Sequence, residues 1–235
     1  MIFRGISDVR FVCVATLANG QAGTLALQSL RQSKIMTNYN FQPKGLRSRI
    51  GWYDRGYIPH FDGGELPQFL TFRLHDSMPQ EVLEKWRIEL AAEGEAGKVT
   101  FRKNVEQYLD QGYGECWLRD ERIAEMTENS LRFHHDKKYR LIAWVIMPNH
   151  LHFLATPLAK VELSDIAHSI KSYTAHEANK ILNRKGQFWQ HEPFDRYIRN
   201  QKHFANVIKY IENNPVNAGL CETAEAWRFS SAFHK

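Results

Sequence analysis

The chain of 235 residues is poor in cysteine, and its three cysteines, Cys13, Cys116 and Cys221, stand far apart. They form no Cys-x-x-Cys pair and fit no disulfide framework, which favours a reducing cytoplasm. No apolar run approaches the length of a membrane span, so we expect no membrane partner. The short apolar segment at residues 11–18 is a poor signal peptide, because Asp8 precedes it among only two arginines.

The sequence also lacks internal repeats, low-complexity tracts and a long flexible linker. Its hydrophobic share of 43% and charged share of 24% are ordinary for a globular protein, and the length suits one or two domains. The net charge of +5 is compatible with a polyanionic partner, although many proteins without one share it.

Two regions differ in their patterning. Residues 1–54 are interpreted as an N-terminal extension or arm, part of it without fixed structure, and residues 55–235 as the catalytic domain. One hypothesis is that Met36 is the natural start, and the alternative is an accessory arm. Mass spectrometry of the native N-terminus would decide between them.

Periodicity predicts a mixed order of strands and helices in residues 55–235. Strands are predicted at residues 66–74, 139–146, 150–156 and within 188–199, and helices at 80–92, 99–110, 119–133, 163–182 and 202–213. Gly94 and Gly97 should interrupt the helical pattern between the first two helices, and Pro215 should stop the last helix. This order predicts an α+β fold, a ferredoxin-like antiparallel sheet with helices packed on one face.

An apolar run at residues 144–154 carries two histidines, His150 and His152, two positions apart. Because side chains on one face of a strand repeat every two residues, both imidazoles should share a face, with Cα atoms roughly 6–7 Å apart. At that distance they can converge on one metal ion. Taken alone, a His-x-His pair is more often structural or exposed than metal-bound.

The last predicted helix has a buried stripe with Tyr210 at its edge. Asn214 follows Tyr210 by four residues, so both side chains can address one point. The stripe consists of Phe204, Val207, Ile208 and Ile211. With Pro215 next to it, Asn214 is expected at the fraying end of the helix.

The motif MPNHLH at residues 147–152 resembles the metal motif of the HUH single-tyrosine transposases, above all the REP-associated tyrosine transposases. Further matching stretches are GQFWQ at 186–190, FDRYIR at 194–199, YIENNPVNAGL at 210–220 and WRFSSA at 227–232. The resemblance covers about residues 55–235 and leaves the first 54 residues outside.

The resemblance implies a single-strand DNA endonuclease and strand transferase acting on single-stranded or hairpin DNA, with REP-type palindromes as substrate. It implies Mg²⁺ or Mn²⁺ held by His150, His152 and Asn214, and Tyr210 as the nucleophile that forms a 5′-phosphotyrosine link. A phenol with a pKa of about 10 is mostly un-ionised at neutral pH, so a cation on the phosphate makes the attack feasible. The strand with the histidines must then face the helix with Tyr210, or the site is assembled between chains. A monomer is favoured, with a dimer as the alternative.

Tyr173 is the rival nucleophile, but its place on the apolar side of its helix favours packing. Candidate DNA-binding residues are Lys171, Arg184, Lys185, Arg196, Arg199 and Lys209. These cations can follow phosphates, and Trp189 and Tyr197 nearby can stack on bases, although a solvated surface and plain core packing are the alternatives. Two other functions stay open: a domesticated nucleic-acid-binding protein that has lost strand transfer, and a metal phosphohydrolase that uses water.

Overall fold

The structure is a computed structural model that describes residues 51–54 and 59–235. The hypothesis of a native start at Met36 lies outside the described residues. Contacts divide the chain into two units, Met1–Tyr39 and Asn40–Lys235, and all described residues belong to the second. Within it, β1 (Gly51–Asp54) pairs antiparallel with β2 (Pro59–Asp62). The domain boundary at residue 54 stays a prediction.

Four strands form the main antiparallel sheet, in the order β4-β5-β3-β6. They are β3 (Gln68–Arg73), β4 (Tyr139–Ile146), β5 (His150–Pro157) and β6 (Phe194–Tyr197). The first and third of these strands in chain order lie in the centre, with the second and fourth at the edges. This is the strand order of the ferredoxin-like plan, so the predicted fold class is confirmed.

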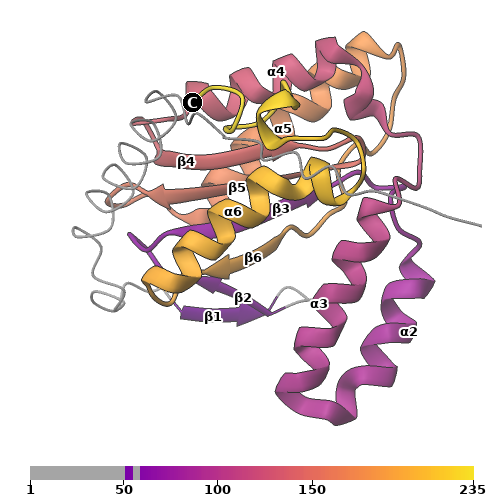
Figure 1. Cartoon of the computed structure of the whole chain (residues 1–235), viewed down its shortest axis with the longest axis vertical. Coiled ribbons are helices and arrows are strands. Elements are labelled where there is room, and N and C mark those ends of the chain that lie inside the picture. The colour runs from indigo at the N-terminus through magenta and orange to yellow at the C-terminus, as the bar shows by residue number, and fades with distance from the viewer. Residues whose placement is uncertain (1–50, 55–58) are drawn as a thin grey trace, which may run out of the picture. The chain divides into compact units, whose positions relative to one another are not determined.

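Five α-helices accompany the sheet in the described part of the chain: α2 (Gln80–Leu90), α3 (Gly94–Asp110), α4 (Glu121–Phe133), α5 (Leu163–Ile181) and α6 (Gln201–Asn217). Helices α4 and α5 pack together on one face, whereas α6 crosses the other face over β4 and β5 (Figure 1). The expectation that all helices cover one face is therefore wrong, and α6 makes the second face a buried one.

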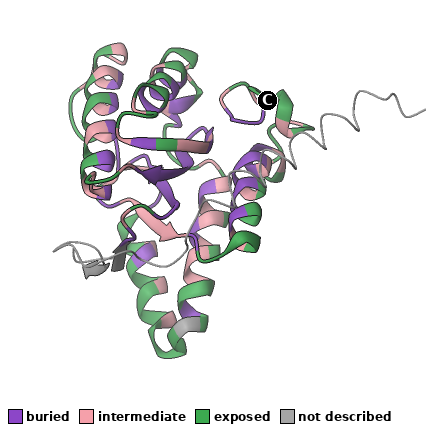
Figure 2. Cartoon of the chain, turned by 90° about the vertical axis from the view of Figure 1, so that its left-hand side faces the viewer, coloured by how far each residue is buried: buried purple, intermediate pink, exposed green. Residues whose placement is uncertain are grey.

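Alternation along the strands separates the two faces of the sheet. The face under α4 and α5 is an apolar core that includes Leu70, Phe72, Leu151, Phe153, Ile123 and Ile170. The intervening residues, such as Thr71 on β3 and His152 on β5, point to the face under α6. The central strands β3 and β5 are buried along their whole length, while the α2–α3 pair is largely exposed (Figure 2). None of the described helices is long and apolar enough to cross a membrane.

Helix α3 begins at Gly94, five residues before the predicted start, and includes Gly97. A Cβ atom on Gly97 would lie 2.1 Å from the carbonyl oxygen of Leu90, a separation that no side chain tolerates. Glycine therefore permits the tight approach between the end of α2 and the start of α3. The two helices form an antiparallel pair beside the sheet (Figure 1).

Pro215 lies inside α6, which continues to Asn217. The predicted stop at Pro215 is therefore wrong. Proline removes one backbone donor, but Ile211, Asn214 and Pro215 are buried against the rest of the domain, and this packing outweighs the local preference. As a result Asn214 is held in a formed turn of the helix and is 0% exposed.

Candidate active site

The two histidines of β5 lie side by side on the face under α6. Their ring centroids are 4.6 Å apart, and each side chain is 1% exposed. The prediction that both imidazoles share one face of a strand is confirmed. Because β5 is buried along its whole length, neither histidine is a surface residue.

Asn149 sets the tautomer of His150. Its Nδ2 donates to the carbonyl oxygens of Leu109 and Tyr113, at 3.1 and 3.0 Å, which fixes the orientation of the amide. Its Oδ1 lies 2.8 Å from His150 Nδ1 and can only accept. The proton of His150 is therefore on Nδ1, and the lone pair of Nε2 is free for a ligand. Nε2 has no hydrogen-bond partner among the described residues.

Thr71 on β3 orients His152, although a hydroxyl can donate or accept and therefore does not fix the tautomer. The Thr71 hydroxyl lies 2.7 Å from His152 Nδ1, and the ring of Phe69 stacks on the imidazole at 5.3 Å. The antiparallel register pairs Thr71 with His152 directly. Sequence analysis missed Thr71 and Asn149. The alternation Phe69-x-Thr71-x-Arg73 was a readable signal for the face of β3, but only the register shows which histidine it meets.

Tyr210 reaches this pair from α6. Its hydroxyl lies 3.4 Å from His152 Nε2, and the edge of its ring meets Phe69 at 6.0 Å between centroids. The condition that the histidine strand faces the Tyr210 helix is thus met within one chain. The position of Tyr210 at the rim of the buried stripe explains this geometry, because the ring packs inward while the hydroxyl reaches the imidazole.

Asn214 supplies the third polar group that a metal would need. Both its amide atoms are buried and without a hydrogen-bond partner among the described residues. The described residues contain no cluster of three or more His, Cys, Asp or Glu side chains, so a cation here would rest on two imidazoles and an amide oxygen. The unpartnered Nε2 of His150 and the unpartnered amide oxygen of Asn214 suit such a cation, and His152 Nε2, which has only the 3.4 Å contact with the Tyr210 hydroxyl, is the other imidazole donor.

Burial keeps these groups neutral. It lowers the pKa of His150 to about 3, an effect that the nearby Asn214 amide partly opposes, and lowers the pKa of His152 well below its usual value. Neutral imidazoles are the form that binds metal. Burial also raises the pKa of Tyr210, with the carboxylates of Glu106 and Asp110 adding to the shift and Arg196 opposing it. Tyr210 is therefore protonated in the free protein.

A cavity of about 390 Å³ opens beside His152. Its walls come from α2, α3, β3 and β6. The lining combines aromatic rings with cations and includes Phe69, Phe101, Phe194, Arg102, Arg196 and Arg199. It places a basic, aromatic hollow directly next to the histidine pair.

The six predicted DNA-binding residues fall into two groups. Arg196 and Arg199 line the cavity, and Lys209 is exposed on α6. The other three come from α5 and the turn after it: Lys171, which donates to the carbonyls of Gln190 and His191; Arg184, which packs on Trp117; and Lys185, which is exposed. Because α5 packs on the opposite face of the sheet, the structure does not bring this second group to the histidines.

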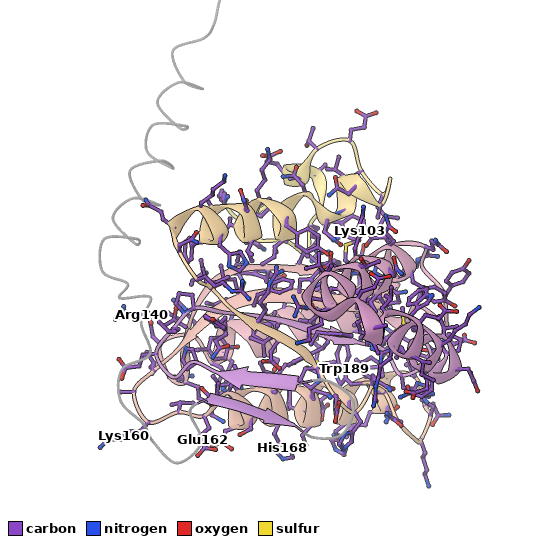
Figure 3. All side chains as sticks on the ribbon, turned by 90° about the horizontal axis from the view of Figure 1, so that it is seen from below. Lys103, Arg140, Lys160, Glu162, His168 and Trp189 are labelled. Carbon is purple, nitrogen blue, oxygen red and sulfur yellow. The ribbon has the colours of Figure 1, made fainter. Side chains whose placement is uncertain are left out.

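The structure also shows the burial and position of two aromatic candidates, Tyr173 and Trp189. Tyr173 is 52% exposed on α5, so the expectation that it packs into the core is wrong, and α5 lies across the sheet from the histidines. Trp189, labelled in Figure 3, is 4% exposed and donates its indole N–H to the Thr174 hydroxyl at 2.8 Å. Trp189 is therefore a core residue and offers no surface for stacking.

Comparison with known proteins finds a family that is similar over the segment carrying this site. Residues 113–214, which hold both histidines, Tyr210 and Asn214, match the model of the family described as "Transposase IS200 like". The α2–α3 pair precedes the matched segment.

Two curated relatives carry a more specific family name. The REP-associated tyrosine transposase of Escherichia coli is 31% identical over 101 residues, which are 43% of this chain and 58% of that protein. A Haemophilus influenzae relative that carries the same family name is 28% identical over 107 residues, 41% of this chain and 60% of that protein. The matches thus span about three fifths of each curated relative. The predicted resemblance to the REP-associated tyrosine transposases is confirmed.

One solved structure, of a REP-associated tyrosine transposase bound to a REP hairpin, shares 19% sequence identity with this chain. The superposition covers 77% of this chain and 82% of that one, with a TM-score of 0.47.

Proposed function

We propose that this protein is a metal-dependent, single-tyrosine DNA endonuclease and strand transferase that acts on single-stranded or hairpin DNA. The observation that carries the proposal is the meeting of the Tyr210 hydroxyl with His152 Nε2 at 3.4 Å, with Asn214 one helical turn beyond Tyr210. A hydrolase that used water would not need a tyrosine at that point.

The ligands of Mg²⁺ or Mn²⁺ are His150, His152 and Asn214. When bound, the cation neutralises charge on the scissile phosphate and lowers the cost of forming a phenolate. Asn149 and Thr71 hold the two imidazoles with Nε2 toward this point. The two imidazoles and the Asn214 amide are buried, which strengthens each electrostatic contact among them.

Tyr210 attacks phosphorus through its phenolic oxygen. The bond from phosphorus to the 3′ oxygen breaks, and that oxygen leaves as a 3′-hydroxyl with a proton taken from solvent. The 5′ side stays joined to Tyr210 as a phosphotyrosine, and the phenolic proton is released. Because the ester retains the bond energy, a DNA 3′-hydroxyl can reverse the step without ATP.

The proposed substrate is a REP-type hairpin with single-stranded flanks, as the name of the Escherichia coli relative suggests. Arg196, Arg199 and Lys209 are on the side of the site and are proposed to contact the phosphate backbone. Such contacts make affinity fall steeply with salt. Since all four site residues come from one chain, a monomer is sufficient for the proposed chemistry.

The test is to incubate the protein with labelled hairpin DNA and Mn²⁺ and to look for a covalent adduct on a denaturing gel. Wild type should form an adduct, and Tyr210→Phe should form none, because it keeps the ring packing on Phe69 and removes only the nucleophile. Chelation of Mn²⁺ should also abolish the adduct.

Tyr173→Phe is the matched control, since Tyr173 is exposed on the far side of the sheet. It should form the adduct as wild type does. An adduct that survives Tyr210→Phe contradicts the proposal. Cleavage without any adduct would identify the protein as a hydrolase, and DNA binding without cleavage would identify a domesticated binding protein.

A further inference from the structure

Arg73 ends β3 on the same face as the histidines. The register of β3 and β5 pairs Arg73 with His150 and Thr71 with His152. Directly paired residues of antiparallel strands have Cβ atoms about 4.5–5.5 Å apart on one face. Arg73 is therefore the immediate neighbour of a proposed metal ligand, although no part of the proposed chemistry uses it.

The guanidinium of Arg73 is buried without a counter-ion. The side chain is 3% exposed, and its Nε and Nη1 have no hydrogen-bond partner among the described residues. Burial lowers its pKa to about 10, which still leaves it charged at neutral pH. The Cζ atom of the guanidinium lies 5.9 Å from the centroid of the Phe194 ring. A buried, unpaired cation is costly, so its presence points to a ligand that completes it.

A second cavity, of about 100 Å³, lies against Arg73 and shares Arg87 and Phe101 with the larger one. Two carboxylates line it. Glu84 pairs with Arg87 at 3.7 Å, and Glu192 is buried with its Oε2 unpartnered and makes no ion pair with Arg73. A phosphate pressed against Glu192 would be repelled. An anion that completes the vacant donors of Arg73 would therefore have to lie on the side of its cross-strand neighbour His150.

We propose that Arg73 binds a backbone phosphate of the DNA strand next to the scissile phosphate, and that the larger cavity holds this strand between the α2–α3 pair and the sheet. The proposal rests on the proposed function for the identity of the ligand. Arginine suits it because its planar fork bonds two phosphate oxygens at once. The aromatic lining, with Phe101 from α3 and Phe194 from β6, gives unpaired bases a surface on which to stack.

The experiment measures binding without chemistry, with Tyr210→Phe protein, in EDTA. The probe is a REP-type DNA hairpin with single-stranded extensions at both ends. Its phosphates are replaced one at a time by neutral methylphosphonates. At one position near the base of the hairpin the replacement should weaken binding by about 10- to 100-fold, the effect of losing a charge-assisted bidentate contact.

The same series with Arg73→Gln added tests the assignment. A methylphosphonate at the sensitive position should then weaken binding by less than about twofold, because the contact between Arg73 and that phosphate is already lost. Lys103→Gln is the matched control: Lys103 is an exposed cation of α3, outside both cavities and labelled in Figure 3. With Lys103→Gln, a methylphosphonate at the sensitive position should still weaken binding by about 10- to 100-fold. If Arg73→Gln leaves it unchanged, or if no position is sensitive in the Tyr210→Phe parent, the proposal is wrong.

Thermal unfolding separates this role from a structural one. An unpaired buried charge predicts that Arg73→Met raises the melting temperature of the free protein while weakening DNA binding. A lower melting temperature would mean that Arg73 is paired in solution, for example with Glu192, and would overturn the proposal. These readouts do not depend on adduct formation. If no adduct forms but Arg73→Gln still removes the sensitivity to methylphosphonate, strand transfer alone is refuted. If the adduct forms but Arg73→Gln leaves that sensitivity unchanged, the role of Arg73 alone is refuted.

Discussion

The two faces of the sheet are built by the same strands and differ in how completely their polar groups are satisfied. Under α4 and α5, two large buried polar side chains have partners: the Tyr139 hydroxyl donates to the Leu131 carbonyl at 2.8 Å, and the Trp189 indole donates to Thr174, while the Thr127 hydroxyl of α4 has no partner among the described residues. Under α6, His150 Nε2, both amide atoms of Asn214 and two nitrogens of Arg73 have none among the described residues.

This difference shows how a strand can serve stability and chemistry at once. Phe72 and Phe153 face the core, while the neighbouring Thr71 and His152 face the site. A buried polar group without a partner costs about 1–3 kcal/mol, so such groups persist where a ligand completes them. One face therefore stabilises the fold, and the other holds unpartnered donors and acceptors that the proposed metal and DNA would complete.

The largest effect on stability is expected at the core face. Phe153 is 0% exposed and meets Phe72 edge-on at 5.3 Å between centroids. Phe153→Ala should lower the free energy of unfolding by about 3–5 kcal/mol in urea denaturation, because it leaves a cavity. Ile88→Ala, at a position 67% exposed on α2, should change it by less than about 0.5 kcal/mol. Equal costs at the two positions would contradict the assignment of the core.

A smaller effect, on ligand binding, is expected at the site face. Asn149→Ala removes the acceptor that fixes the His150 tautomer and should weaken Mn²⁺ binding by about 10- to 100-fold in calorimetric titration. Asn149→Asp retains an acceptor at that point but sets its second oxygen against the carbonyls of Leu109 and Tyr113, so it should recover only part of the affinity. If Asn149→Ala binds Mn²⁺ as wild type does, the tautomer has no role in metal binding.

The smallest effect is expected at Asp110, at the end of α3. Burial raises its pKa from 3.8 to about 6, so the folded protein holds a proton that the unfolded chain has released. Stability from this group is therefore lost as pH rises from about 4 to 6. Asp110→Asn should stabilise the protein by up to about 1 kcal/mol at pH 7.5, discounted for partial exposure, and by little at pH 4. A gain that is equal at both pH values would show that the charge of Asp110 is not the cause.

Local periodicity was enough to predict the elements that carry the site. A period of two placed His150 and His152 on one face, and a period of 3.6 placed Tyr210 at the rim of a buried helix face. The order of strands and helices then gave the ferredoxin-like fold. These are properties of neighbouring residues, so they can be read from the sequence itself.

Several helix bounds and residue roles could not be predicted from the sequence, because they depend on contacts between residues that are distant in the chain. The continuation of α6 through Pro215 depends on packing against the sheet, and the early start of α3 depends on the close approach of Gly97 to Leu90. Thr71 and Arg73 gain their roles only from the register of β3 with β5. The exposure of Tyr173 depends on how α5 is rotated against α4, which periodicity determined only roughly.

The most direct measurement is to digest the covalent protein–DNA adduct of the unmodified protein and to identify the modified peptide by mass spectrometry. The account predicts a nucleotide 5′-phosphate on Tyr210, in the peptide that also contains Asn214. A nucleotide on Tyr173, across the sheet, or on Tyr197 would contradict it, because Tyr210 would then not be the nucleophile.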